Sequence, residues 1–124
     1  MLTFSRLILY SKDVEELKNF YQQHFGFLLV EEIKDEWIVL KAGQIQLALH
    51  RVGKEYEGFN STYVAQSNAK MVFTINSDIH QFRDKLIAGK VSMRKVRSYS
   101  GFNYLLCDGT DPEGNVFQLM QFEK

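Results

Sequence analysis

The chain has little that would stabilise it covalently or direct it to a charged partner. It contains one cysteine, Cys107, among 124 residues, so no disulfide forms within the chain, which is typical of reducing compartments. Fifteen basic residues balance fifteen acidic ones, and no dense run of Lys and Arg predicts a nucleic-acid surface. No apolar stretch approaches the length of a membrane span. We therefore expect a cytoplasmic protein that binds neither nucleic acid nor membranes.

The overall amino-acid composition is that of one compact globular domain. Hydrophobic residues make up 45% of the chain and charged residues 24%, which are ordinary values for a globular protein. A chain of this length buries a core without metals or disulfides.

The first half alternates between strand and helix patterns. Residues 3–10 alternate in the manner of a strand. Asp13 followed by Glu16 is a capping box, and Gly26 ends the helix that begins there. Three further strand-like runs follow, with short turns between them, at residues 27–33, 36–42 and 44–52.

The second half repeats this order. A strand at residues 70–75 precedes a helix capped by Ser77 or Asp78 and ended by Gly89. Three more strands are predicted, at residues 91–96, 102–108 and 115–122, with Asp108-Gly109 opening the last turn.

The repeated order indicates an internal duplication of a βαβββ unit, in which Arg6 corresponds to Lys70. We predict a first unit at residues 1–52, a connecting loop at 53–69 and a second unit at 70–124. Each unit buries one face of a mixed sheet under its helix. The other faces together form a cup.

Two segments carry a family resemblance, "SKDVEELKNFYQQHFGF" at residues 11–27 and "DPEGNVFQLMQ" at 111–121. With the duplication, they resemble the vicinal oxygen chelate superfamily, which holds glyoxalase I, bleomycin resistance proteins, fosfomycin resistance enzymes and extradiol dioxygenases. The resemblance implies a single α+β domain of two tandem βαβββ units. In it a curved mixed sheet surrounds a cup, and the helices lie on the outer face. It also implies a homodimer.

In metal-using members each unit supplies two ligands, commonly a His from its first strand and a Glu from its last. The resemblance puts these positions at Arg6, Gln46, Lys70 and Gln118. Arginine and protonated lysine offer no lone pair, and neutral amides are weak oxygen donors. We therefore expect no metal at the family position and no other cofactor.

The residues predicted to line the cup form a mixed polar and aromatic set. They are Arg6, Trp37, Gln46, His50, Lys70, Tyr104 and Gln118. The two cations favour an anionic or carbonyl-rich ligand.

Other interpretations stay open for each of these residues. Arg6 and Lys70 instead pair with acidic side chains, and the two glutamines hydrogen-bond each other or water. His50 is then only a partly exposed polar residue, and at least one of Trp37 and Tyr104 is ordinary packing.

The first functional hypothesis is a metal-free protein that binds a small molecule, as bleomycin resistance proteins do. The alternative is a lyase or isomerase related to glyoxalase I, with an atypical site that uses His50 or a set of metal ligands that the sequence pattern does not reveal. A third possibility is a protein-interaction module whose cup is filled by its own side chains. Analysis of bound metal distinguishes the first two, and thermal shifts with small molecules test the third.

Overall fold

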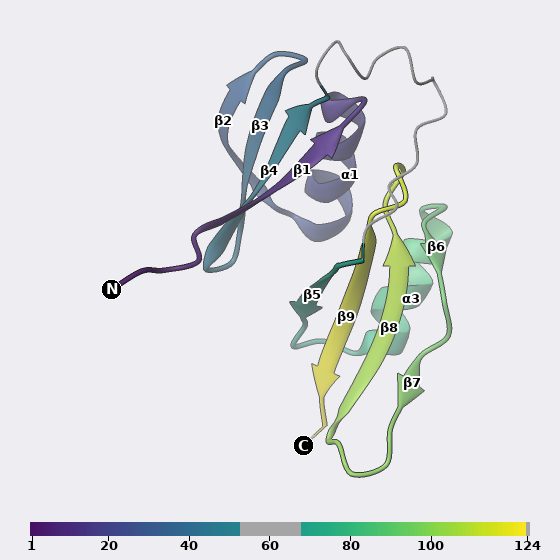
Figure 1. Ribbon diagram of the computed structural model, residues 1–124. Helices are drawn as coiled ribbons and strands as arrows, with labels where there is room; N and C mark the ends of the chain where they lie inside the picture. The colour runs from purple at the N-terminus through teal and green to yellow at the C-terminus, as the bar shows by residue number, and fades with distance from the viewer. Residues whose placement is uncertain (53–67, 124) are drawn as a thin grey trace. The chain divides into compact units, whose positions relative to one another are not determined.

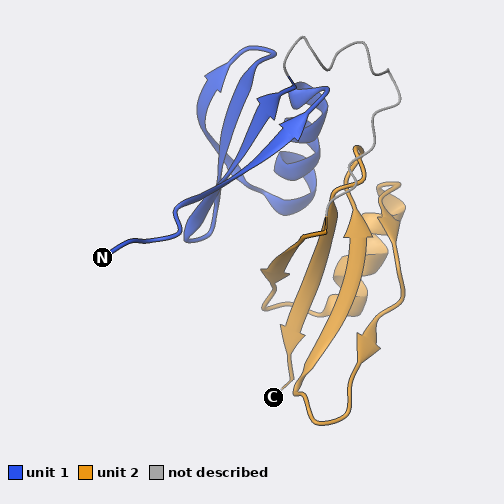
Figure 2. Ribbon diagram, viewed as in Figure 1, with its two compact units in different colours: residues 1–63 blue, residues 64–124 orange. Residues whose placement is uncertain are grey.

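The chain forms two compact units, residues 1–63 and 64–124 (Figure 2). The computed structural model describes residues 1–52 and 68–123. The predicted connecting loop, residues 53–69, lies outside the described residues except for its last two positions.

Unit 1, residues 1–63, holds one helix and a four-stranded mixed sheet within its described part (Figure 1). Its elements are β1 (Arg6–Ser11), α1 (Val14–Phe25), β2 (Leu28–Ile33), β3 (Trp37–Ala42) and β4 (Ile45–Arg51). The strand order is β1-β4-β3-β2, with β1 parallel to β4 and the other pairs antiparallel. Helix α1 packs on β3 and β4, so it covers one face of the sheet.

The ends of α1 are those that the sequence predicts. The Asp13 side chain accepts a hydrogen bond from the backbone N–H of Glu16 at 3.1 Å, and Gly26 adopts the left-handed conformation with φ of 69°. Only glycine enters that region without strain, so it is suited to end a helix. The buried stripe of α1 includes Leu17 and Tyr21, neither of which is exposed to solvent.

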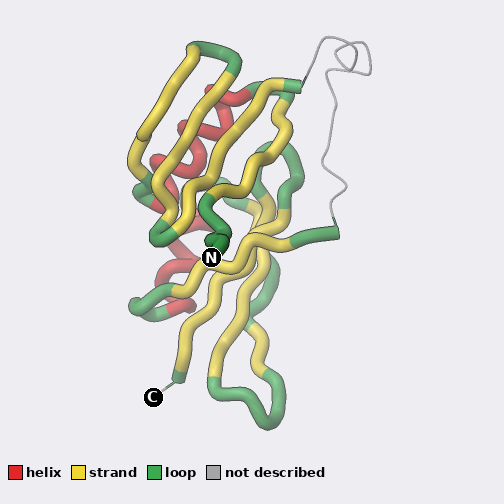
Figure 3. The backbone as a smooth tube through the Cα atoms, turned by 60° about the vertical axis from the view of Figure 1, so that its left-hand side comes forward, coloured by secondary structure: helices red, strands yellow, loops and turns green. Residues whose placement is uncertain are grey.

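Unit 2, residues 64–124, repeats the order with one strand in two pieces. Its described elements are β5 (Lys70–Thr74), α3 (Ile79–Ala88), β6 (Ser92–Met93), β7 (Arg97–Ser98), β8 (Tyr104–Thr110) and β9 (Val116–Phe122). The order is β5-β9-β8-β6, and β7 also pairs with β8. Asp78, rather than Ser77, caps α3, and its carboxylate accepts from the N–H groups of His80 and Gln81. In each unit the helix lies along one side of the sheet (Figure 3). The α+β fold of two tandem βαβββ units is confirmed.

The strand predicted at residues 91–96 is interrupted by a β-bulge. Met93 lies opposite Gly109 and Arg97 opposite Leu106, so residues 94–96 face only two residues of β8. A comparable shift occurs in unit 1, where Leu29 and Glu31 of β2 pair with consecutive residues of β3. Each bulge changes the face to which the following side chains point.

The prediction that Asp108-Gly109 opens a turn is wrong, because β8 continues to Thr110. A side chain at Gly109 would collide with the ring of Phe117 and the sulfur of Met93, so the glycine serves close packing. The turn comes later and is built around Asp111. Its carboxylate accepts from the backbone N–H groups of Glu113 and Asn115 at 2.9 and 3.0 Å.

The helix-covered face of each sheet is apolar and buried, as the alternation predicts. Its fully buried members include Ile38, Leu40 and Leu49 in unit 1 and Phe117 and Leu119 in unit 2. Among the described residues, no helix combines the length and apolarity needed to span a bilayer. The opposite face of each sheet, called its open face below, carries the predicted site residues.

Candidate functional site

The open face of unit 1 consists of cross-strand rows that run across its strands. The first row is Arg6, Gln46 and Lys41; the second is Ile8, Ala48, Val39 and Glu31; the third is Tyr10, His50, Trp37 and Ile33. Side chains in one row are neighbours, because directly opposed residues of paired strands point the same way.

A guanidinium group organises this face. Arg6 donates from Nε and Nη2 to Gln46 Oε1 at 3.0 and 2.7 Å. Its Nη2 also lies 3.8 Å from Glu31 Oε1. The Arg6 Cζ atom stands 5.5 Å from the ring centroid of Trp37, and Trp37 Nε1 donates to Glu31 Oε2 at 3.0 Å. One polar network therefore joins Arg6, Gln46 and Trp37 with Glu31.

His50 belongs to an aromatic row beside this network. Its ring centroid lies 5.6 Å from that of Tyr10, and 5.6 Å from that of Trp37 at an interplanar angle of 80°. The His50 side chain is exposed. Unit 1 thus brings together all four of the lining residues predicted within it.

The open face of unit 2 has a different register. Lys70 lies opposite Val116, whereas Gln118 lies between Val72 and Asp108. The next rows contain Met120, Leu106 and Arg97, and then Phe122 and Tyr104. Lys70 is therefore one row away from Gln118, while Arg6 is directly opposite Gln46.

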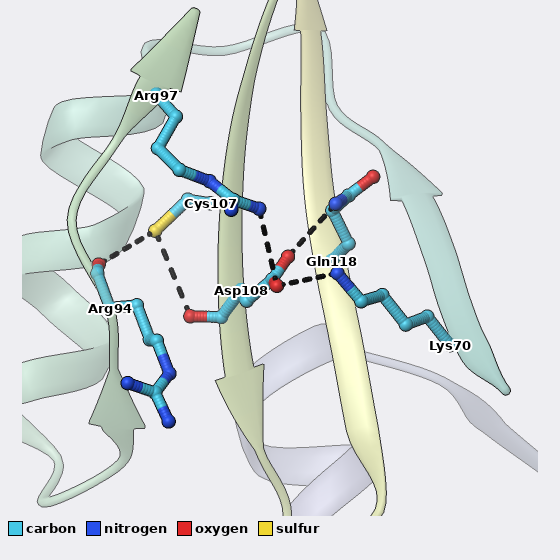
Figure 4. A network of polar contacts seen from close by, with 6 residues as sticks. All are labelled: Lys70, Arg94, Arg97, Cys107, Asp108 and Gln118. Atoms are coloured by element: carbon cyan, nitrogen blue, oxygen red, sulfur yellow. Dashed lines mark hydrogen bonds and ion pairs between the residues drawn. The ribbon is translucent and has the colours of Figure 1, made fainter. Parts of the chain in front are cut away.

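Asp108 holds the polar groups of unit 2 together (Figure 4). Its Oδ2 atom lies 2.7 Å from Lys70 Nζ and 3.3 Å from Arg97 Nη2, and its Oδ1 accepts from Gln118 Nε2 at 2.9 Å. The Asp108 side chain is 13% exposed, against 46% for Lys70 and 43% for Arg97. Two cations share one carboxylate, which leaves one positive charge uncompensated within this cluster.

The pKa of Asp108 reflects these contacts. Burial raises it, but the hydrogen bonds from Lys70 and Gln118 and the charges of Lys70 and Arg97 lower it more, so the pKa lies below its ordinary value. The carboxylate is therefore ionised at neutral pH.

Tyr104 lies on the same open face, two rows from Asp108. Its ring contacts that of Phe122 edge-on at 5.9 Å and that of Phe102 at 5.7 Å. Unit 2 therefore brings Lys70 and Gln118 into one network and places Tyr104 in an aromatic group beside it.

Three further residues, Glu31, Arg97 and Asp108, join these networks although the sequence analysis did not select them. Arg6 and Lys70 each have an acidic neighbour, at 3.8 and 2.7 Å. Gln46 bonds to Arg6, and Gln118 bonds to Asp108. Pairing with acids, which the sequence left as an alternative for the two cations, occurs in both units.

Cys107 is a structural thiol in this arrangement. It is fully buried, and its Sγ lies 3.2 Å from the backbone oxygen of Arg94 at the bulge. Burial raises the pKa of the thiol, which keeps it protonated and unreactive.

The side chains at the family's ligand positions do not suit a divalent metal ion. Gln46 Oε1 already accepts two hydrogen bonds from Arg6. Lys70 and Arg97 would repel a cation approaching Asp108. Across residues 1–52 and 68–123, no three His, Cys, Asp or Glu side chains are grouped so as to hold a metal.

Comparison with known proteins identifies the family. A family model described as the Glyoxalase/Bleomycin resistance protein/Dioxygenase superfamily matches residues 3–119, and the chain belongs to this superfamily. A search of curated protein sequences finds no match.

Several solved structures share the fold. FosX, a genomically encoded fosfomycin resistance protein from Listeria monocytogenes, is 15% identical, with a TM-score of 0.78 over 98% of this chain and 93% of its own. Lactoylglutathione lyase from Agrobacterium tumefaciens is 15% identical, with a TM-score of 0.76 over 96% and 92%. A glyoxalase/bleomycin resistance protein/dioxygenase family enzyme from Burkholderia phytofirmans PsJN is 19% identical, with a TM-score of 0.79 over 98% and 99%. At these identities the likeness concerns the fold.

Proposed function

We propose that the protein binds a small anionic or carbonyl-rich molecule without a metal ion. The observation that carries this proposal is the cluster at Asp108, where Lys70 and Arg97 share one carboxylate. Both cations are nearly half exposed, so a ligand oxygen can reach them. Gln118 adds a side-chain amide to the same cluster.

The open face of unit 1 supports the same ligand chemistry. Arg6 and Lys41 stand in one row and outnumber Glu31, the acidic residue on that face. The side chain of Arg6 is about one third exposed, and its guanidinium is oriented by Gln46 and Trp37. A pre-oriented guanidinium loses less conformational entropy when it binds a carboxylate than a mobile one does.

Metal independence is supported by the same side chains. A divalent ion needs deprotonated or strongly polarised oxygen, nitrogen or sulfur ligands. Arginine, lysine and hydrogen-bonded glutamine at the four family positions supply positive charge and weak donors instead.

A second candidate function, a lyase or isomerase reaction, is favoured by the position of His50. Its ring is exposed on the open face that also carries Arg6, and a histidine there is suited to move a proton of a bound carbonyl compound.

Metal analysis and calorimetry test the proposal. Protein purified without chelator should contain no stoichiometric divalent ion. Titration with sodium pyruvate and sodium succinate should show binding that EDTA leaves unchanged and that added salt weakens. Lys70→Gln and Arg97→Gln should each weaken binding roughly threefold to tenfold. Lys85→Gln removes an exposed charge on α3 and is the matched control, with no expected effect.

Three results would count against it or for the second candidate. A chelator-sensitive, stoichiometric metal ion would refute metal independence. If the Lys70, Arg97 and Lys85 variants all bind the anions with equal affinity, the assignment of the anion site to Lys70 and Arg97 is wrong. Conversion of pyruvate or another probe, lost in His50→Gln, would favour the enzyme.

We also propose that the protein acts as a homodimer in the cytoplasm. Family membership supports the dimer, and the single buried thiol suits a reducing compartment. Light scattering coupled to size-exclusion chromatography tests the dimer, which a monomeric mass at micromolar concentration would contradict.

A further inference from the structure

Each open face carries an aromatic cross-strand pair at the same distance from its glutamine. In unit 1 the pair is Trp37 and His50, with ring centroids 5.6 Å apart and an interplanar angle of 80°. His50 follows Gln46 by two rows on β4, which corresponds to about 13 Å along a strand.

Unit 2 repeats this geometry with different residues. Tyr104 and Phe122 are cross-strand partners, with ring centroids 5.9 Å apart and an interplanar angle of 82°. Phe122 follows Gln118 by two rows on β9. The two pairs share strand positions, spacing and ring orientation, although no residue type is common to them.

Between the glutamine and the aromatic pair, the two central strands carry apolar residues in both units. These are Ala48 and Val39 in unit 1, and Met120 and Leu106 in unit 2. On the two central strands of each open face, a polar position, an apolar pair and an aromatic pair therefore follow one another, and a charged side chain, Glu31 or Arg97, ends the middle row.

These rings are not needed for the helix-covered core, because they point away from the helices. Phe122 is 52% exposed and His50 is exposed, while Trp37 and Tyr104 are half-buried; the neighbouring rings of Phe102 and Tyr10 are exposed too. Exposed aromatic groups of this kind mark binding surfaces more often than scattered apolar residues do.

An arginine stands next to each pair. The Arg6 Cζ atom lies 5.5 Å from the Trp37 ring centroid. Arg97 lies in the row beside Tyr104, opposite Leu106, and reaches Asp108. A planar ring and an adjacent cation are complementary to a flat molecule that carries one negative group.

We infer that the two aromatic pairs are ring-binding elements and that the ligand is an aromatic carboxylate. The ring stacks against Trp37 and His50 or against Tyr104 and Phe122, and the carboxylate accepts hydrogen bonds from the adjoining cations. This inference rests on the proposed function and narrows its ligand class.

The test compares two carboxylates of similar size and equal charge, sodium benzoate and sodium cyclohexanecarboxylate, by calorimetry. Benzoate has a π face and the cyclohexane ring has none. Benzoate should bind roughly threefold to tenfold more tightly. Trp37→Leu and Tyr104→Leu should each reduce this preference, whereas Trp37→Phe and Tyr104→Phe, which keep a ring, should retain it.

The outcomes separate the two levels of the proposal. Equal affinity of the unaltered protein for both compounds overturns the aromatic inference and leaves anion binding standing. Binding of neither compound, when pyruvate or succinate does bind, also overturns the aromatic inference, whereas failure of all four anions to bind overturns the proposed function itself. A preference that survives both leucine variants, each verified as folded by circular dichroism, overturns the assignment of the aromatic pairs.

Discussion

Unit 1 and unit 2 have the same order of elements, and each places a glutamine on its last strand, Gln46 on β4 and Gln118 on β9. The two glutamines form their hydrogen bonds in opposite ways. Gln46 accepts from a cation, Arg6, whose acidic neighbour Glu31 is 54% exposed. Gln118 donates to an acid, Asp108, which is largely buried and holds two cations. The comparison teaches that both units keep a glutamine at the same position of the fold, while the residue that it bonds to changes from a cation to an acid.

The two units also differ in how the first strand is aligned with the last strand. Arg6 and Gln46 are direct cross-strand partners, whereas Val72 stands opposite Gln118 and Lys70 stands one row away. Lys70 still joins the network, because its long side chain reaches Asp108 diagonally.

The largest expected effects on stability come from substitutions in the two hydrophobic cores, and the effect should be similar in both units. Leu49→Ala in unit 1 and Leu119→Ala in unit 2 each remove a fully buried side chain and should each lower the free energy of unfolding by about 2–5 kcal/mol. Urea denaturation followed by circular dichroism measures the loss. Ile87→Ala, at an exposed position of α3, is the control and should cost under about 0.5 kcal/mol. A clear inequality between the two leucine variants would break the equivalence of the units.

The next effect should separate the units. Asp108→Asn removes the charge that Lys70 and Arg97 share and should lower the free energy of unfolding by about 1–2 kcal/mol. Glu31→Gln removes a mostly exposed charge 3.8 Å from Arg6 and should cost less than about 1 kcal/mol. Matched urea denaturation curves give both values. If Glu31→Gln costs more, the contrast between a buried and an exposed acid is wrong.

A smaller effect is expected from the cation above Trp37. Arg6→Gln removes the contact with the indole ring and should lower the free energy of unfolding by roughly 0.5–1 kcal/mol. Trp37 is the only tryptophan, so the emission spectrum reports this site directly and should change. Lys85→Gln, which removes an exposed charge on α3, serves as the control. Identical spectra for the Arg6 variant and the unaltered protein would exclude the contact.

The smallest expected effects concern the pH dependence of stability. The two units should lose stability in different pH ranges. Burial lowers the pKa of His24 on α1. The unfolded chain therefore takes up a proton first, and stability falls as the pH drops below about 6.5. Asp108 also has a lowered pKa. Its stabilising effect is complete above the ordinary aspartate value of about 4 and is lost as the pH falls through its lower folded value.

Urea midpoints measured from pH 8 to pH 3 follow both groups. His24→Gln should flatten the change around neutrality, and Asp108→Asn should flatten the acidic one. If the loss of stability near neutral pH persists unchanged in His24→Gln, a group other than His24 causes it.

Much of the fold follows from the sequence, because its signals are local. Asp13 and Gly26 bound α1 as predicted, since a capping carboxylate and a left-handed glycine act within a few residues. Strand alternation separates the helix-covered side of β9, with Phe117 and Leu119, from its open side, with Gln118.

Two of the three site residues that the sequence did not indicate share a physical cause. Glu31 and Arg97 both follow a bulge, and an extra residue reverses the face that simple alternation assigns. Regular alternation along β2 would place Glu31 under the helix. Asp108 was missed because Asp-Gly is a common turn signal, whereas here the glycine is required by packing against Phe117.

The position of Asp108 has a consequence for any anion that enters unit 2. Because its carboxylate already pairs with Lys70 and Arg97, an incoming ligand competes for these two cations with a carboxylate that the chain itself supplies. Affinity for benzoate should therefore rise when that competitor is neutralised, as in Asp108→Asn, even though the same change weakens the fold. A tighter-binding yet less stable variant would mean that this unit gives up affinity in exchange for stability when no ligand is bound.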